Sequence, residues 1–423
     1  MSEAARQLAV LFREQHGRLL ALLLRHAGLT RLAAAEDALQ QAMLAALRHW
    51  PFDGVPQRPE AWIFEVARRA LIDEQRGGAR RETGHDLDAL PAVSSADGAP
   101  VGRFARELDE DELALLFAVC HPALAPASQV ALALRTLGGF GLRELSAGLL
   151  VSEAALAQRL KRARDELAAR GEALAVPPPA ELPARREAVL AAIYLMFNEG
   201  YQSAAGDDYA RRELCFEAIR LARALAAHPV TGGPAADAFA ATLCLHAARL
   251  GGRIDADGAP LLLPEQPRER WDRGLVALGL RHLDRARAGD ALTRWHCEAA
   301  IAAAHATAAR HEDTDWPLIV LWYERLLALD PAPAARLAHA IAIGQAHGPA
   351  AGLSAVDAVL PQLPRARYPF GHAARGDFLA RLGERDAAGA AYTQALSQAR
   401  SDAERMLLAR KHRDLDDAPP GDG

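Results

Sequence analysis

Residues Leu142 to Arg170 read LRELSAGLLVSEAALAQRLKRARDELAAR, and this stretch decides the fold that the sequence predicts. Two short helical patterns, Leu142–Leu149 and Ser152–Ala169, are separated by barely a turn, which is typical of a helix-turn-helix. The Ser152 hydroxyl is placed to cap the second helix. One apolar stripe at helical spacing must pack against the rest of its domain, and it consists of Leu156, Leu160, Ala163 and Leu167.

The opposite side of the second helix carries a small residue, then an amide, then cations. This order suits a helix that enters the major groove of DNA. The alternative interpretation is an ordinary surface helix of a bundle with a solvated charged face, and the stretch alone does not decide between the two. The residues on this side are Ala154, Gln158, Lys161, Arg162 and Asp165, with Arg159 on the flank.

Composition limits the class of protein. A chain of 423 residues is long enough for two or three domains. Hydrophobic residues make up 51% of it, and because Ala and Leu dominate them, we expect an all-α fold. The net charge of −5 excludes a generally basic nucleic-acid coat protein, so any DNA contact must come from local clusters.

Cysteine spacing and hydropathy narrow the class further. The four cysteines show no CxxC spacing, so neither a zinc site nor a disulfide framework is indicated. No signal peptide or apolar run of membrane-spanning length is visible, so we expect a soluble, cytoplasmic protein without membrane contact. Sequence motifs of enzymes are absent as well, including HExxH, a phosphate loop and GxSxG, so we expect no catalysis, metal or cofactor.

The chain is organised into successive helical segments. Three helical patterns, Ala5–Ala27, Ala33–Trp50 and Glu60–Gln75, close a compact domain at the N-terminus. Apolar residues of the second pattern recur as Ala35, Leu39, Met43 and Leu47. The expected divisions are a first domain at 1–77, a flexible linker at 78–106, a four-helix domain at 107–172, a Pro-rich junction at 173–183, a helical extension at 184–415 and a disordered tail at 416–423.

Several of these features occur in a specific order. AEDALQQAMLAALRHW comes first, PEAWIFEVARRALIDEQR follows, and after a linker comes the four-helix unit that ends in the helix-turn-helix. Over residues 1–170 this arrangement resembles an extracytoplasmic-function sigma factor, a bacterial RNA polymerase subunit with sigma regions two and four only. The resemblance implies that residues 1–77 are region two and that residues 107–172 are region four. It also implies core RNA polymerase and promoter DNA as partners.

The resemblance assigns a polymerase contact to the second helix. In the family this helix docks on the clamp coiled coil of the largest catalytic polymerase subunit. Gln41 stands where the family usually has glutamate, and Met43 stands where it often has phenylalanine. The residues implied to bind core polymerase are Asp37, Gln40, Gln41 and Leu44.

The resemblance also implies two DNA contacts. The third helix of region two melts and reads the −10 element in the family, and the last helix of region four reads the −35 element. Arg69 replaces a frequent asparagine, and a tryptophan such as Trp62 on an apolar stripe is more often a core residue. The implied −10 contacts are Trp62, Arg68, Arg69, Asp73 and Arg76. The implied −35 contacts are Ser152, Gln158, Arg159, Lys161 and Arg162.

The C-terminal extension is again helical. Residues 372–399, HAARGDFLARLGERDAAGAAYTQALSQA, have the small and aromatic residue spacing of a tetratricopeptide helix pair. The layout resembles the subgroup of these sigma factors with a long tetratricopeptide-like extension, and YLMFNEGY at Tyr194–Tyr201 looks like its signature. Within it, Asn198, Glu199 and Tyr201 have either a ligand or partner role or a structural one at a helix end.

Three functional hypotheses follow. The first is a sigma factor whose extension regulates it through an intramolecular contact with the sigma domains, or else recruits a partner. The second is a stand-alone helix-turn-helix regulator with a repeat-type sensor. The third is a repeat-domain scaffold whose basic helix is only a solvated surface. The region-two resemblance favours the first, because neither alternative needs the helix of Asp37 and Gln40.

Overall fold

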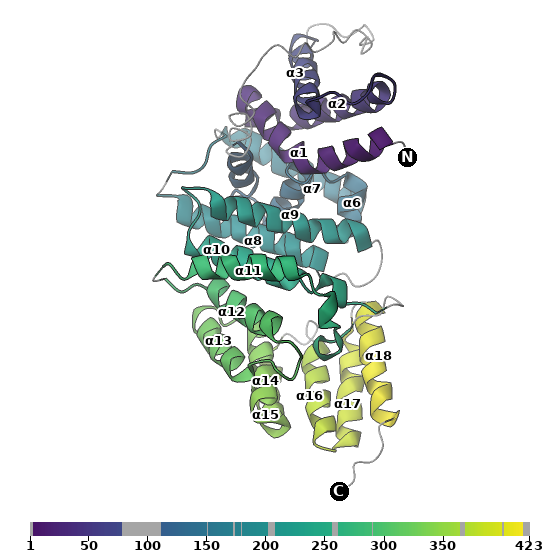
Figure 1. Cartoon of the computed structure of the whole chain (residues 1–423), viewed down its shortest axis with the longest axis vertical. Coiled ribbons are helices and arrows are strands. Elements are labelled where there is room, and N and C mark those ends of the chain that lie inside the picture. The colour runs from purple at the N-terminus through teal and green to yellow at the C-terminus, as the bar shows by residue number, and fades with distance from the viewer. Residues whose placement is uncertain are drawn as a thin grey trace. The chain divides into compact units, whose positions relative to one another are not determined.

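The computed structural model describes residues 3–77, 111–149, 151–171, 174–178, 180–201, 208–255, 261–289, 291–363, 369–399 and 402–417. Across these ranges the chain is all-α, which confirms the predicted fold class (Figure 1). None of the described helices has the length and apolarity needed to cross a membrane. The chain divides into two compact units, Met1–Glu199 and Gly200–Gly423, which are described separately.

The N-terminal half of the first unit is a three-helix domain. It consists of α1 (Glu3–Ala27), the 3-10 turn η1 (Leu29–Arg31), α2 (Leu32–Asp53) and α3 (Pro59–Gly77). α2 contacts both α1 and α3, and the buried leucines of α1 fill the centre of the domain. Helix α2 ends at Gly54, where φ is +84°. This backbone conformation is strained for any residue with a Cβ.

The rest of the first unit contains the predicted helix-turn-helix. A helix over 111–119 precedes α5 (Pro126–Thr136), α6 (Leu142–Gly148) and α7 (Glu153–Arg170). Ser152 is the N-cap of α7, and its hydroxyl accepts a hydrogen bond of 3.3 Å from the Ala155 N–H. The predicted apolar stripe is confirmed, because Leu156, Leu160, Ala163 and Leu167 are all buried.

α8 (Leu182–Tyr201) is the first helix after the Pro-rich junction. Its residues up to Glu199 belong to the first unit, although the sequence analysis places them in the extension. The Arg185 guanidinium on α8 donates a hydrogen bond of 2.9 Å to the Phe117 carbonyl oxygen. The extension therefore begins with a helix that is bonded to the predicted region four.

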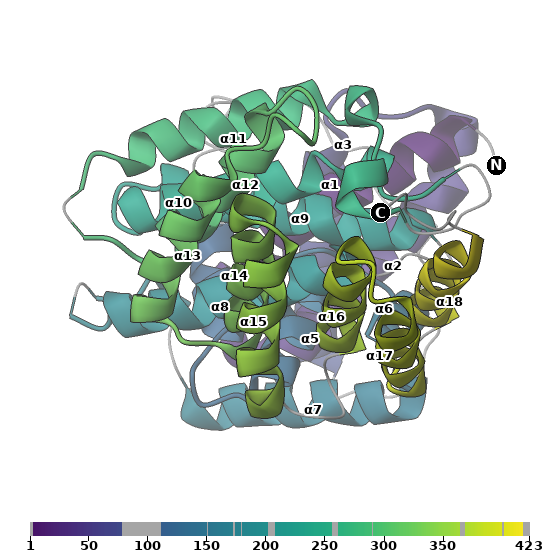
Figure 2. The same ribbon diagram turned by 90° about the horizontal axis from the view of Figure 1, so that it is seen from below.

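The second unit is an array of helices in which sequence neighbours contact one another. Figure 2 shows α14 and α15 side by side, with α16, α17 and α18 following. The array contains α9 (Asp208–Ala227), α10 (Pro234–Ala247), α11 (Arg273–Ala286), α12 (Arg294–Thr307), α13 (Trp316–Leu329), α14 (Pro333–His347), α15 (Pro349–Val359), α16 (Pro369–Arg381), α17 (Arg385–Ser397) and α18 (Asp402–Asp417). Between α10 and α11 lie the 3-10 turns η2 (Leu250–Gly252), η3 (Leu263–Glu265) and η4 (Arg268–Arg270), and between α15 and α16 lies η5 (Leu360–Gln362).

The predicted tetratricopeptide-like pair corresponds to α16 and α17. The turn between these helices contains Gly383, whose φ is +81°. The helices approach closely at Gly376, where an added Cβ would lie 2.9 Å from the Tyr392 ring. Only glycine permits this contact, which explains the small residue at that position.

Candidate functional site

The predicted polymerase-binding residues lie together on α2. Asp37, Gln40, Gln41 and Leu44 are all exposed, and their spacing of i, i+3, i+4 and i+7 places them on one helical face. Leu44 is 55% exposed, although a leucine at such a position usually packs inside a domain. The structure therefore brings these four residues into one continuous surface, which we call the α2 stripe.

The predicted apolar side of α2 is partly wrong. Ala35 and Leu39 are buried as expected, but Leu47 is 45% exposed and extends the α2 stripe. The prediction followed steps of four residues, and each such step turns about 40° past a full rotation of a helix with 3.6 residues per turn. Three steps displace Leu47 from the buried face, which instead continues through Ala46 and Trp50.

The predicted −10 residues lie on α3. The Trp62 ring is half-buried and packs edge-on against Trp50, with 5.6 Å between ring centroids. This contact supports the structural interpretation of Trp62 over free base stacking. Asp73 is exposed, whereas the Arg76 side chain is outside the described residues.

Arg68 and Arg69 share a single carboxylate. Glu65 accepts two hydrogen bonds from Arg68, of 2.9 and 2.8 Å, and one of 3.0 Å from Arg69. Hydrogen bonding from Arg68, followed by that from Arg69, holds the pKa of Glu65 below its usual value. The sequence analysis missed Glu65, although its spacing of three and four residues before two arginines signals such pairs. The cationic patch on α3 therefore carries one net positive charge from these three residues.

The predicted −35 residues lie on the outer side of α7. Gln158, Lys161 and Arg162 are exposed, and Arg159 is half-buried. Lys161 forms an exposed ion pair of 2.7 Å with Asp165, one turn further along the helix. A recess of about 280 Å³ separates this side from α5 and is lined by Ser128, Ala155, Gln158, Arg159 and Arg162.

Ser128 was missed by the sequence analysis. It lies in the first turn of α5, after Pro126 at the start of that helix. Helix N-termini favour anions because their first N–H groups point outward and the helix dipole is positive there. The Pro-Ala-Ser start of α5 was the available signal. The recess thus adds a helix N-terminus to the two arginines of α7.

The two predicted sigma regions contact each other inside the first unit. The Arg164 guanidinium of α7 forms an ion pair with the buried Glu36 carboxylate of α2. Burial raises the pKa of Glu36, and the charge of Arg164 opposes that rise. Arg25 of α1 also pairs with Asp111 at 3.4 Å. None of these residues belongs to the α2 stripe or to the predicted reading side of α7.

The predicted extension signature lies at the end of α8. Asn198 and Glu199 are half-buried in its last turn. The Arg253 guanidinium stacks 3.9 Å from the Tyr201 ring and donates a hydrogen bond to the Tyr201 carbonyl oxygen. The His246 and Tyr201 rings form a T-shaped pair, and burial lowers the pKa of His246 to about 3. These contacts give Tyr201 a structural role in the second unit.

The remaining groups with possible site chemistry are the potential metal ligands and the cysteines. Within the ranges that the structure describes, no three or more His, Cys, Asp and Glu side chains are placed to hold a metal ion. The four cysteines are buried and form no disulfide bonds, and burial raises the pKa of Cys120, Cys215 and Cys244 to about 12. These three thiols are therefore protonated at neutral pH.

Two family models match the chain. The model of sigma-70 region 2 matches residues 11–81, and the model of a family of unknown function, DUF6596, matches residues 185–287. The second match includes the YLMFNEGY motif at Tyr194–Tyr201.

Two relatives extend this comparison. An uncharacterized protein of Rhizobium meliloti is 36% identical over 378 residues, which cover 89% of each chain. The ECF RNA polymerase sigma factor SigL of Mycobacterium tuberculosis is 38% identical over 102 residues, which cover 23% of this chain and 58% of SigL. Together with the helix-turn-helix, these matches define a sigma factor, a class that binds core RNA polymerase and promoter DNA. The matches support a sigma factor similar to the extracytoplasmic-function type, with a C-terminal extension that contains the DUF6596 segment.

Proposed function

We propose that the chain directs core RNA polymerase to promoters and initiates transcription, and that its C-terminal array regulates this activity. The observation that carries the proposal is the α2 stripe, because Asp37, Gln40, Gln41 and Leu44 are exposed together on one face. A surface that presents a leucine, a carboxylate and two amides to solvent suits a protein partner. A stand-alone DNA-binding regulator has no use for it.

Two further surfaces are proposed to contact the promoter. The −10 contacts are assigned to α3, where the shared Glu65 carboxylate orients Arg68 and Arg69. The −35 contacts are assigned to α7 and its recess, where cations are exposed beside the α5 N-terminus. Arginine and glutamine read bases through paired hydrogen bonds, and the remaining cations position the phosphates.

Co-purification with core RNA polymerase tests the polymerase contact. The test variant is Asp37→Arg plus Gln40→Ala, which changes the α2 stripe alone. A matched control is Asp53→Arg plus Gln57→Ala, because both residues are exposed but lie outside the stripe. We expect the wild type and the control to retain polymerase and the test variant to lose it. Equal retention by both variants would contradict the assignment, and no binding by the wild type would favour the stand-alone regulator.

The proposed regulatory role rests on α8. This helix starts the extension and is bonded to the predicted region four through Arg185 and the Phe117 carbonyl. The same helix continues in sequence into the array, so it connects the array covalently to the predicted region four. Promoter-dependent transcription by the full chain and by residues 1–175 provides the test. We expect the two rates to differ, and identical rates would refute regulation by the extension.

A further inference from the structure

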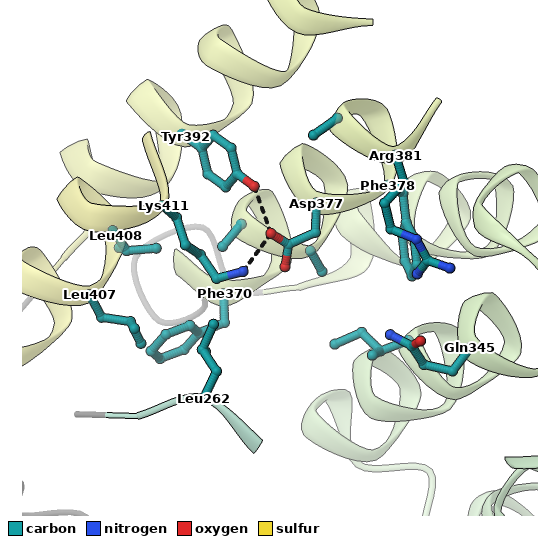
Figure 3. A pocket seen from close by; sticks show the side chains of 14 residues that line it. Leu262, Gln345, Phe370, Asp377, Phe378, Arg381, Tyr392, Leu407, Leu408 and Lys411 are labelled. Carbon is teal, nitrogen blue, oxygen red and sulfur yellow. Dashed lines mark hydrogen bonds and ion pairs between the residues drawn. The ribbon is translucent and has the colours of Figure 1, made fainter. Parts of the chain in front are cut away.

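The second unit contains a cavity of about 470 Å³ that none of the proposed transcription contacts uses. Side chains of α14, α16, α17 and α18 line it, together with Leu262. Its volume falls in the range of small-molecule sites, which bury most of their ligand among apolar side chains and a few polar groups. The lining has this composition (Figure 3).

The two ends of the cavity differ in polarity. At one end the side chains of Leu262, Phe370 and Leu407 gather, and Phe370 is 42% exposed although it is a large apolar ring. At the other end lie Arg381 and Gln345, whose guanidinium and amide groups are hydrogen-bond donors (Figure 3). An occupant therefore meets an apolar surface at one end and donors at the other.

The charges of the lining leave one cation without a counter-charge. Asp377 Oδ1 accepts a hydrogen bond of 2.6 Å from the Tyr392 hydroxyl and one of 2.5 Å from Lys411 Nζ, so Asp377 and Lys411 neutralise each other. Arg381 lies one turn after Asp377 on α16, with its guanidinium 5.6 Å from the Phe378 ring. Among the described residues Arg381 forms no ion pair. The lining thus carries a net charge of one positive unit, located at the donor end.

We propose that this cavity binds a small elongated carboxylate with an apolar body. The carboxylate accepts charge-assisted hydrogen bonds from Arg381 and a hydrogen bond from the Gln345 amide, and these bonds are stronger than those of a neutral head group. The apolar body lies toward Phe370 and Leu407, where burial of its surface is favourable. A cationic head group is excluded, because the end that it would occupy is already positive.

Isothermal titration of the full chain with three ten-carbon ligands tests the head-group preference. Decanoate, 1-decanol and decyltrimethylammonium share one tail and differ in charge, and all are used below their micelle concentrations. We expect decanoate to bind with one site per chain, decanol to bind about ten-fold more weakly, and the cation to give no binding. Equal affinity for the three would indicate a general apolar groove, as for a peptide, and would overturn the proposal. Absence of decanoate binding would overturn it as well.

Two variants locate the ligand in the cavity. Arg381→Gln should weaken decanoate about ten-fold and leave decanol unchanged, because only the charge-assisted bond is lost. Arg375→Gln is the matched control: it lies on the same helix, pairs with Asp357 at 2.7 Å and does not line the cavity. Phe370→Ala should weaken decanoate more than hexanoate, since the shorter tail does not reach the apolar end. Equal effects of the two arginine variants, or no chain-length dependence in Phe370→Ala, would contradict the assigned orientation. Circular dichroism checks that each variant is folded.

Discussion

Arg164 of α7 and Glu36 of α2 form an ion pair that joins the two predicted sigma regions within the first unit. The Glu36 side chain is 4% exposed and that of Arg164 is 23% exposed. A carboxylate so buried is stabilised in its charged form mainly by the cation beside it. Separation of the two regions therefore requires water to replace Arg164 at Glu36. The strength of this ion pair thus contributes to the free energy of their association.

Removal of Arg164 should destabilise the first unit. We expect Arg164→Met to lower the free energy of unfolding by about 2–3 kcal/mol, less than for a fully buried pair because Arg164 is partly exposed. The double variant Arg164→Met with Glu36→Gln should recover part of the loss, since no charge is left buried. Urea unfolding measures these changes. Arg170→Met is the control, because its partner Glu166 is exposed and the expected change is within about 0.5 kcal/mol. A loss as large in the control would contradict the role of burial.

The contact between the regions also bears on promoter binding. The −10 and −35 elements are about 25 base pairs apart, which is roughly 85 Å of DNA at ~3.4 Å per pair. A compact unit of this length has a diameter of roughly 40–45 Å, and in it α7 packs against η1, next to α2. If α3 reads the −10 element and α7 reads the −35 element, as proposed, we expect the two regions to separate before both elements are read.

A covalent link between the regions should block promoter-dependent transcription. The variant Arg25→Cys with Asp111→Cys can be joined by a short bismaleimide, because this pair also links the two regions and Arg25 is exposed. The native cysteines do not compete, because they are buried. We expect the linked protein to lose transcription from a promoter with both elements and to keep binding to a −35 duplex alone. The same protein without the reagent, and each single-cysteine variant with it, are the controls. Full transcription by the linked protein would show that separation is not required.

The sequence predicted local features of this site better than contacts between distant segments. The buried stripe of α7 and the Ser152 cap were predicted, because helical spacing and capping depend on residues within one or two turns. Leu47 was misplaced, because small angular errors accumulate along a helix. The pair of Glu36 and Arg164 spans 128 residues and has no local pattern. The packing of α8 with the first unit was not predicted for the same reason. A Pro-rich junction indicates a boundary in the sequence, but the helix after it can still pack against the preceding domain.

Asp165 should weaken the attraction of α7 for DNA. Its carboxylate pairs with Lys161 on the reading side, at 2.7 Å. We expect Asp165→Asn to strengthen binding to a −35 duplex several-fold at low salt and to steepen the dependence of log K on log salt by about one unit, because Lys161 then neutralises one more phosphate. Fluorescence anisotropy over a series of salt concentrations measures both. Glu166→Gln removes one negative charge from the same helix, next to Arg170 instead of Lys161, and serves as the control. If Glu166→Gln increased the affinity for the duplex equally, the effect would come from net charge and not from the release of Lys161.

His16 gives the first unit a defined dependence on pH. The imidazole is buried on α1 against Gly139, where an added Cβ would lie 2.8 Å from the ring. Burial, followed by the charge of Arg135, lowers the pKa of His16 from its usual 6.5 to about 3. Between these two values the unfolded chain binds more protons than the folded chain, so stability is lost as the pH falls below 6.5 and is retained above it.

Substitution of His16 should remove this dependence. Between pH 7 and pH 5 its contribution to the free energy of unfolding falls by about 2 kcal/mol, at roughly 1.4 kcal/mol per pKa unit of difference. His16→Phe keeps a planar ring but cannot bind a proton, so its loss of stability over this range should be smaller than that of the wild type by the same amount. Urea unfolding of both proteins at several pH values measures the difference, and the other buried histidines cancel because both proteins contain them. If the free energy of unfolding changed with pH equally in both proteins, His16 would be exposed to water, and α1 would not pack tightly against the helix-turn-helix domain at Gly139.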